Sequence, residues 1–488
     1  MAKILSSQSQ KIKRRKCSSE KSTKNTMILK DILTYISSEF LYHRDTLNLI
    51  CCCKHFNIDP YQFNLHSNKD IKIKEGNQKI IHFDELTLYA NDDLKKLNFS
   101  RTKMKILKTE NFNQQLPETL PQCLEEIYFG TPYNYPLPKN LPHSLQIINL
   151  GPNYNHPLPE NLPKSLKEIH FGCYYNHPLP DNLPQSLKQI YFGSEYNIEL
   201  PSELPDSLEQ IHFGNSYNQL LPETLPKSLQ EIHFGHNYNQ PLPTNLPRSL
   251  KKICFGNNYN KKITSKLPDS LEEIRFDFKY NQPLPETLPK SLMMIKFGEY
   301  YNQPLHENLP QSLKEIHFGD HYNFALPQKL PQSLRNIKFG SAYNCPLPSN
   351  LPQSLRYIDL GWYYNYPLLN NLPRSLKIIV FSVKYNHPLP ENLPQSLEEI
   401  YLGWRYNHPL PDNLPQSLKK IYCGNAYNHP LPGKLPDSLQ IINLGNSYNH
   451  PLPEKLPQSL KKIVIGFSYD QYNHPFPKNL PRSLITRI

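Results

Sequence analysis

The apolar positions of this chain repeat every 21 residues over most of its length. In one representative unit, Leu250, Ile253 and Phe255 are apolar, and polar or small residues stand between them. The Tyr-Asn or Phe-Asn pair that opens each unit recurs without a slip until the last one. A fixed period of this length is the signature of a solenoid, in which each unit buries its apolar face by stacking on its neighbours. The sequence therefore predicts 18 repeats over residues 112–488.

Each unit divides into a strand and a return segment. The Leu-x-x-Ile-x-Phe spacing is that of a leucine-rich repeat, whose short strand sends alternate side chains into the core. Pro241, Pro243 and Pro247 precede this strand. Because proline fixes φ and lacks a backbone donor, that half of the unit is expected to be an extended return segment on the convex side. The fold class predicted is a mainly β solenoid.

Three further positions of the unit have predicted structural roles. Tyr238, Leu242 and Leu246 are expected to complete the apolar lining. Gly256 follows the strand, where we expect a turn with positive φ. Asn239 is expected to bond through its side chain to the backbone of the next rung, forming a ladder along the stack.

The chain before the repeats falls into three predicted parts. Residues 1–26 form a basic tail that carries +7 of the net charge of +12, which leaves +5 for the rest. The tail is expected to be disordered, and it is either a solvated tail or a nuclear-import or nucleic-acid patch. Residues 27–57 read as a short helical module, with apolar residues at helical spacing. Residues 58–111 read as divergent rungs that cap the solenoid, with strands at 71–74, 86–89 and 94–99.

The repeated elements Tyr/Phe-Asn-x-Pro-Leu-Pro and Leu-Pro-x-Ser-Leu-x-x-Ile-x-Phe-Gly resemble the FNIP repeat, a relative of the leucine-rich repeat known mainly from amoebae and the giant viruses that infect them. The resemblance covers about three quarters of the chain and implies a binding scaffold. A frequent companion of these repeats in the family is an N-terminal F-box.

Residues 27–57 resemble such an F-box through Asp31-Ile32-Leu33, Asp45 and Cys53-Lys54-His55-Phe56, although Leu29 replaces the usual proline. The resemblance implies docking on a Skp1-like adaptor and, through it, a cullin–RING ubiquitin ligase. The residues it assigns to adaptor binding are Ile28, Leu29, Ile32, Leu33, Leu49 and Phe56. The alternative is that these residues pack against the solenoid as its N-terminal cap.

A target protein would be held where the repeats differ. The strand residue between the inward Ile and Phe points to the concave face, and its column is rich in aromatic and histidine side chains, with the basic residues Arg275, Lys296 and Lys338 at its middle. Aromatic side chains are enriched in binding hot spots. The predicted target-binding residues are Tyr128, His170, Tyr191, His212, His233, His317, Tyr401, Tyr422, Trp362 and Trp404. The two tryptophans either anchor a partner or cover neighbouring rungs.

No motif of an enzyme, cofactor site or metal site stands out. The nine cysteines lack zinc spacing and, without a secretion signal, indicate a reducing intracellular compartment, cytoplasmic or nuclear. Histidines recur in the Tyr-Asn-His-Pro turn, as at His156 and His177, and read as turn residues rather than metal ligands. We expect no membrane segment, and the local basic excess gives no reason for the solenoid to bind nucleic acid.

Two functions follow from these expectations. The first is a non-catalytic substrate receptor of a cullin–RING ligase, with the adaptor at residues 27–57 and a protein target on the concave face. The second is a binding scaffold without a ligase, in which the N-terminal helices are only a cap and the basic tail has a possible nuclear role.

Overall fold

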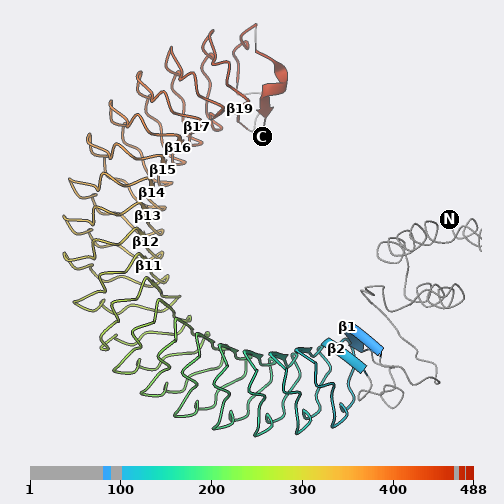
Figure 1. Cartoon of the computed structure of the whole chain (residues 1–488). Helices are drawn as coiled ribbons and strands as arrows, with labels where there is room; N and C mark the ends of the chain where they lie inside the picture. Colours follow the sequence, from blue (N-terminus) through green and yellow to red (C-terminus); the bar gives the residue numbers. More distant parts are fainter. Residues whose placement is uncertain (1–80, 89–101, 467–471, 479, 488) are drawn as a thin grey trace, which may run out of the picture.

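The computed structural model describes residues 81–88, 102–466, 472–478 and 480–487. They form one parallel sheet of 20 strands that winds into an arc, with the strands along its inner side (Figure 1). The strands are β1 Ile81–Leu88, β2 Thr102–Thr109, β3 Glu126–Tyr128, β4 Ile147–Asn149, β5 Glu168–His170, β6 Gln189–Tyr191, β7 Gln210–His212, β8 Glu231–His233, β9 Lys252–Cys254, β10 Glu273–Arg275, β11 Met294–Lys296, β12 Glu315–His317, β13 Asn336–Lys338, β14 Tyr357–Asp359, β15 Ile378–Val380, β16 Glu399–Tyr401, β17 Lys420–Tyr422, β18 Ile441–Asn443, β19 Lys462–Ile465 and β20 Ile485–Arg487. The one helical segment in this part of the chain is the 3-10 turn η4, Arg482–Leu484.

Every strand pairs with the strand of the next rung, and the pairing register keeps equivalent residues side by side. Ile295 of β11 lies opposite Ile316 of β12, and Ile316 lies opposite Ile337 of β13. A shift by one residue would turn every inward side chain outward, so the central isoleucine of each strand fixes the register. The predicted solenoid of 21-residue units is confirmed.

The core is a continuous column of apolar side chains rather than a globular centre. In the representative rung Tyr238, Leu250 and Ile253 are fully buried, and Leu242 and Phe255 are nearly so. The rings of Tyr238 and Tyr259 in successive rungs stack with their centroids 6.0 Å apart. Each rung thus buries its aromatic and aliphatic groups only against the rungs on either side.

Two polar ladders join the rungs outside the sheet. The backbone N–H of Asn260 donates to Oδ1 of Asn239 at 2.9 Å, and the same bond recurs along the stack. This confirms the asparagine ladder predicted from the sequence. The second ladder was not predicted: Oγ of Ser249 donates to the carbonyl of Leu229 at 2.7 Å, and equivalent serines do the same in most rungs.

The prediction of positive φ at the strand-end glycines is wrong for most rungs. Among the described glycines only Gly151, Gly361 and Gly445 have positive φ, and each follows a strand that ends in Asn or Asp. At Gly256 the reason for glycine is space, because a Cβ there would lie 1.7 Å from the carbonyl oxygen of Gly235 in the preceding rung. The glycines allow adjacent turns to approach closely.

The two ends of the described sheet differ from its middle. β1 and β2 have 8 residues each, and β2 was not predicted. At the other end η4 leads into β20, which pairs with β19. The predicted basic tail, the F-box-like module and the expected strands at 71–74 and 94–99 lie outside the described residues. No helix within the described part is long and apolar enough to span a membrane.

Candidate functional site

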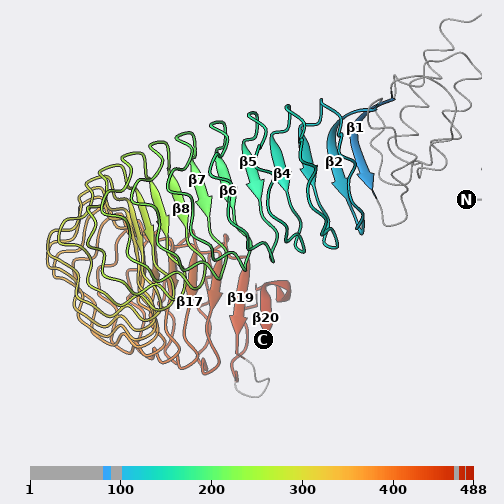
Figure 2. The same ribbon diagram turned by 90° about the horizontal axis from the view of Figure 1, so that it is seen from below.

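The concave face is formed by the first and third side chains of strands β3 to β19, because the middle side chain points into the core. In nearly all of these strands the middle residue is buried and the flanking two are partly or fully exposed. Figure 2 shows the strands side by side along this face. The face therefore presents two parallel columns of side chains whose identities change from rung to rung.

The two columns contact each other within individual strands. The hydroxyl of Tyr128 donates to Glu126 at 2.9 Å, and the hydroxyl of Tyr401 donates to Glu399 at 2.6 Å. His233 lies 3.0 Å from Glu231 in the same manner. Because these partners are two residues apart on one strand, the first residue orients the third.

Four of the predicted target-binding residues form a stack of rings on successive rungs, which we call the four-ring stack: His170, Tyr191, His212 and His233. The ring centroids of neighbours are 4.3, 4.5 and 4.1 Å apart, and the planes are nearly parallel. Face-to-face stacking between rungs leaves the ring edges toward solvent. The carboxylates of Glu168 and Glu231 contact the two outer histidines.

Burial within this stack changes the acidity of its members. Desolvation, reinforced by the neighbouring His233, lowers the pKa of His212 to about 4. The hydrogen bond from His233 lowers the pKa of Glu231. The stack therefore holds a neutral imidazole at His212 beside a carboxylate at neutral pH.

A second aromatic site lies on β16 and β17. The rings of Tyr401 and Tyr422 stack at 4.7 Å, and Nζ of Lys420 lies 2.8 Å from Glu399. The predicted residue Tyr128 lies apart from both sites, at β3, where Lys108 is 5.9 Å from its ring. His317 lies between Lys296 and Lys338 in the middle of the face.

Trp362 and Trp404 do not lie on the concave face but on the turns that follow β14 and β16. Their exposed fractions are 50% and 61%, and Tyr363 beside Trp362 is also 50% exposed. Nζ of Lys384 lies 5.8 Å from the centre of the Tyr363 ring. These turns therefore present exposed aromatic side chains, and one of the rings has a cation beside it.

The turn histidines are used structurally. Nε2 of His156 donates to the carbonyl of Asn134 at 3.0 Å, and His387, His408 and His429 make the equivalent bond. Within the described residues no group of three or more His, Cys, Asp or Glu side chains is arranged to hold a metal ion. Five cysteines in this part are free thiols: Cys123, Cys173, Cys254, Cys345 and Cys423.

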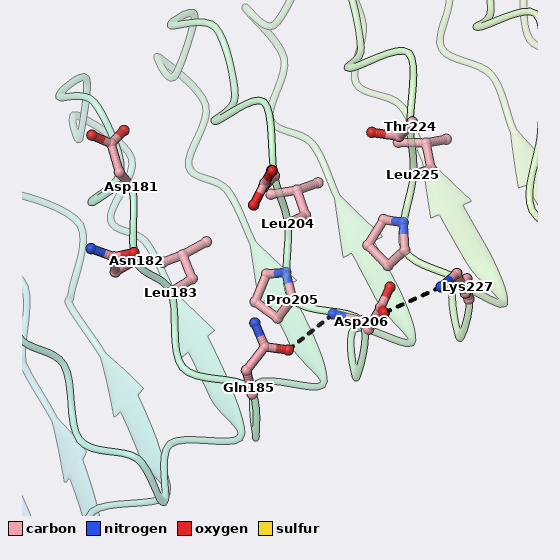
Figure 3. A pocket seen from close by; sticks show the side chains of 12 residues that line it. Asp181, Asn182, Leu183, Gln185, Leu204, Pro205, Asp206, Thr224, Leu225 and Lys227 are labelled. Atoms are coloured by element: carbon pink, nitrogen blue, oxygen red, sulfur yellow. Dashed lines mark hydrogen bonds and ion pairs between the residues drawn. The ribbon is translucent and has the colours of Figure 1, made fainter.

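A shallow depression of about 540 Å³ lies among the return segments before β6, β7 and β8 (Figure 3). Asp206 contacts Lys227 at 3.7 Å there, and its backbone N–H donates to Gln185. None of the predicted site residues lines it, and no separate feature of the sequence pointed to it. Its lining repeats from rung to rung and includes the equivalent leucines Leu183, Leu204 and Leu225, so it is a product of rung packing.

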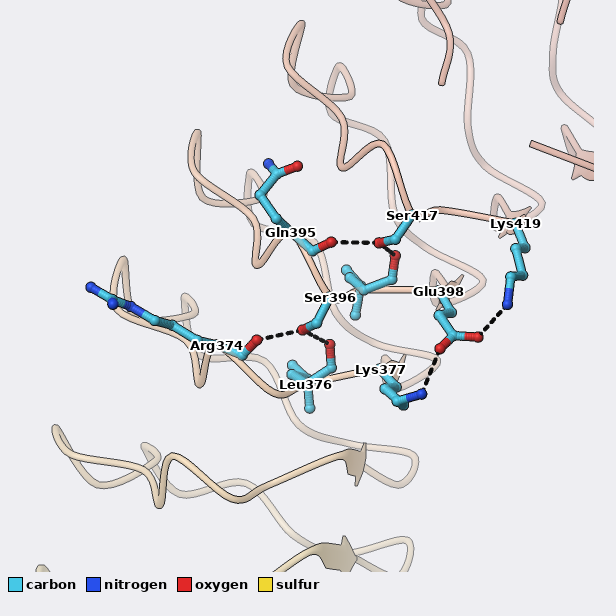
Figure 4. Close-up of polar contacts among 9 residues, drawn as sticks. Arg374, Leu376, Lys377, Gln395, Ser396, Glu398, Ser417 and Lys419 are labelled. Atoms are coloured by element: carbon cyan, nitrogen blue, oxygen red, sulfur yellow. Dashed lines mark hydrogen bonds and ion pairs between the residues drawn. The ribbon is translucent and has the colours of Figure 1, made fainter. Parts of the chain in front are cut away.

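Charged residues just before the strands form pairs across rungs. Glu398 accepts from Lys377 and Lys419, each at 2.7 Å, which lowers the pKa of Glu398 to about 2 (Figure 4). In the same view Ser396 and Ser417 donate to carbonyl groups of the preceding rung. This charged position was not predicted as a site, although it recurs every 21 residues in the sequence, as at Lys377, Glu398 and Lys419.

The predicted adaptor-binding residues, Ile28, Leu29, Ile32, Leu33, Leu49 and Phe56, lie outside the described part of the chain. The structure accordingly shows where the predicted target-binding residues lie, and binding at both sets of residues remains a prediction. It brings four of them together in the four-ring stack and two more in the Tyr401–Tyr422 pair, and the basic middle of the face separates these two groups.

The chain is similar to two solved structures, and the first of them supports the repeat architecture. The crystal structure of CroV588, described as a novel circular LRR protein, is 32% identical with a TM-score of 0.64, and the match covers 79% of this chain and 66% of that one. YopM from Yersinia enterocolitica is 22% identical with a TM-score of 0.49, and the match covers 79% of this chain and 91% of YopM. No curated protein matches the chain.

The family model described as FNIP Repeat matches successive, partly overlapping stretches that together run from residue 133 to residue 468. These stretches contain strands β4 to β19, the buried tyrosine column and most of the concave face described above. The chain therefore belongs to the FNIP repeat family.

Proposed function

We propose that this protein is the non-catalytic substrate-recognition subunit of a cullin–RING ubiquitin ligase. The concave face holds a protein target, and residues 27–57 recruit a Skp1-like adaptor that connects the chain to the cullin. The chain contributes proximity, since a bound target is held at high effective concentration near the ubiquitin carrier.

Binding of a target on the concave face is supported by one observation. The inward strand position is nearly constant along the repeats, whereas the outward position varies. The middle residue of nearly every strand is a buried isoleucine, whereas the third residue varies from Tyr to His, Arg, Lys and Asp. A rigid frame that repeats while its exposed side chains differ is suited to protein–protein interaction. The aromatic groups there provide large contact areas with few rotatable bonds.

The ligase half of the proposal is supported by the resemblance of residues 27–57 to an F-box. It is tested by a pull-down of the full chain with purified Skp1 and cullin. We expect capture by the native chain and loss of capture by the double variant Ile32→Asp/Leu33→Asp.

The matched control is the concave variant Tyr401→Ala/Tyr422→Ala, which alters the proposed target-binding face and should capture the adaptor as well as the native chain. If the native chain is folded and fails to capture Skp1, the ligase role is wrong. The remaining function is then the binding scaffold without a ligase, for which the concave face is equally suited.

A further inference from the structure

Four exposed cations in the middle of the arc have no ion pair or side-chain hydrogen bond among the described residues. They are Lys296, Arg335, Lys338 and Arg356, which we call the unpaired basic cluster. Several cations at or beside equivalent positions of other rungs are paired: Lys188 contacts Glu209 at 2.8 Å, and Lys420 contacts Glu399 at 2.8 Å. The cluster therefore gathers, on neighbouring rungs, cations that lack such partners.

The cluster occupies one continuous area of the concave face and its border. Lys296 and Lys338 end strands β11 and β13 and flank His317 of β12 in the paired register. Arg335 and Arg356 precede β13 and β14, and the backbone N–H of Arg356 bonds to the carbonyl of Arg335 at 2.7 Å. With rungs about 4.8 Å apart, the four cations lie within two or three rungs of one another.

Three carboxylates on the neighbouring strands contact groups other than the four cations. Glu315 accepts from Nδ2 of Asn336 at 3.0 Å and lies 3.6 Å from His317. Asp359 accepts the backbone N–H of Gly361 at 3.0 Å, and Glu273 is paired with Arg275. Glu315 and Asp359 keep their negative charge and offset part of the cluster, but neither forms an ion pair with its four cations. A net positive charge therefore remains for a partner to balance.

We propose that strands β11 to β14 bind an acidic, extended segment of a protein partner, with its carboxylates on the unpaired basic cluster. This inference rests on the proposed target-binding function and specifies the chemistry of the target. An extended segment can run along the arc, across the strands, and meet one cation after another.

The aromatic groups that flank strands β11 to β14 along the face favour a protein segment over a nucleic acid. Single-stranded nucleic acids bind by stacking their bases on open aromatic faces. In the four-ring stack and in the Tyr401–Tyr422 pair, the rings stack on each other, so they offer edges rather than open faces. Ring edges are suited to contacts with apolar and carbonyl groups of a polypeptide.

The test measures fluorescence anisotropy of a labelled oligoglutamate peptide with the full chain, beside an oligolysine peptide and an oligothymidylate of equal length. We expect oligoglutamate to bind, with an affinity that falls as salt is raised. The variant Arg335→Glu/Lys338→Glu should raise its dissociation constant by about tenfold or more. The matched control Lys164→Glu/Lys290→Glu changes the charge equally at exposed lysines outside the face and should have little effect.

Equal losses in the two variants would show a nonspecific charge effect and overturn the inference. Tighter binding of oligothymidylate than of oligoglutamate would overturn it in favour of a nucleic acid. Absence of oligoglutamate binding by a chain that still captures Skp1 would overturn the inference and leave the proposed function standing. Failure to capture Skp1 by a chain that still binds oligoglutamate would contradict the ligase role and leave this inference standing.

Discussion

At the residue scale, the strand-end glycines show how closely the rungs approach. A Cβ on Gly256 would lie 1.7 Å from a backbone oxygen, which cannot move without shifting the preceding rung. We expect Gly256→Ala to lower the free energy of unfolding by about 2–4 kcal/mol, measured by urea unfolding followed by circular dichroism. A Cβ on Gly433 would meet no atom within 4 Å, so Gly433→Ala should change stability by less than about 0.5 kcal/mol. Equal effects at the two sites would contradict the close approach.

His212 should make stability depend on pH. Its pKa is lowered from 6.5 to about 4 by burial and by His233, with Lys252 and His170 acting in the same direction and Glu231 opposing them. Between pH 4 and pH 6.5 the unfolded chain carries a proton on this imidazole that the folded chain lacks. The free energy of unfolding should therefore rise with pH across this range.

The measurement is the urea midpoint of the native chain and of His212→Gln across this pH range. The native chain should gain more stability with rising pH than the variant, which lacks the titrating group. Parallel curves for the two proteins would show that His212 is not held neutral in the folded state.

At the element scale, the serine ladder ties the turn before each strand to the preceding rung. Oγ of Ser396 lies 2.6 Å from the carbonyl oxygen of Arg374 and 2.7 Å from that of Leu376. We expect Ser396→Ala to destabilise the fold by about 1 kcal/mol, because two acceptors lose a shared donor. Ser396→Thr keeps the hydroxyl and serves as the control. An alanine variant as stable as the native chain would show that the ladder contributes nothing.

The elements also show what the sequence alone could predict. The strands and the asparagine ladder follow from one repeating unit, because Ile253 and Asn239 recur at fixed positions and their roles follow from spacing. The glycine role was misjudged, since its cause is a contact between rungs rather than a local backbone angle. Such contacts depend on how tightly rungs stack, which a single unit does not reveal.

The sequence predicts which residues lie on the concave face, but not how their side chains contact one another. Alternation places His170, Tyr191 and His212 on one face. That these rings stack on each other, and that Glu168 holds one of them, depends on side-chain rotamers across rungs. Only half of the unpaired basic cluster was predictable, because Arg335 and Arg356 lie just before the strands rather than in the column of third strand residues.

At the scale of the whole molecule, stability should be distributed along the stack. Each rung contacts only its neighbours in the sheet, so damage in one rung should remain local. We expect Ile253→Ala to cost about 2–5 kcal/mol and to increase amide hydrogen exchange mainly in β8, β9 and β10. A uniform increase from β3 to β19 would indicate a single cooperative unit instead.

Binding of a partner on the concave face can be tested by site-specific photo-crosslinking. A photo-reactive amino acid is placed at Tyr191 or Lys338 on the concave face, and at Lys164 or Lys290 outside it, in the full chain expressed in cells. We expect one partner to be crosslinked from the concave positions and not from the outer ones. Crosslinking of that partner from the outer positions alone would show that the concave face is not its binding surface.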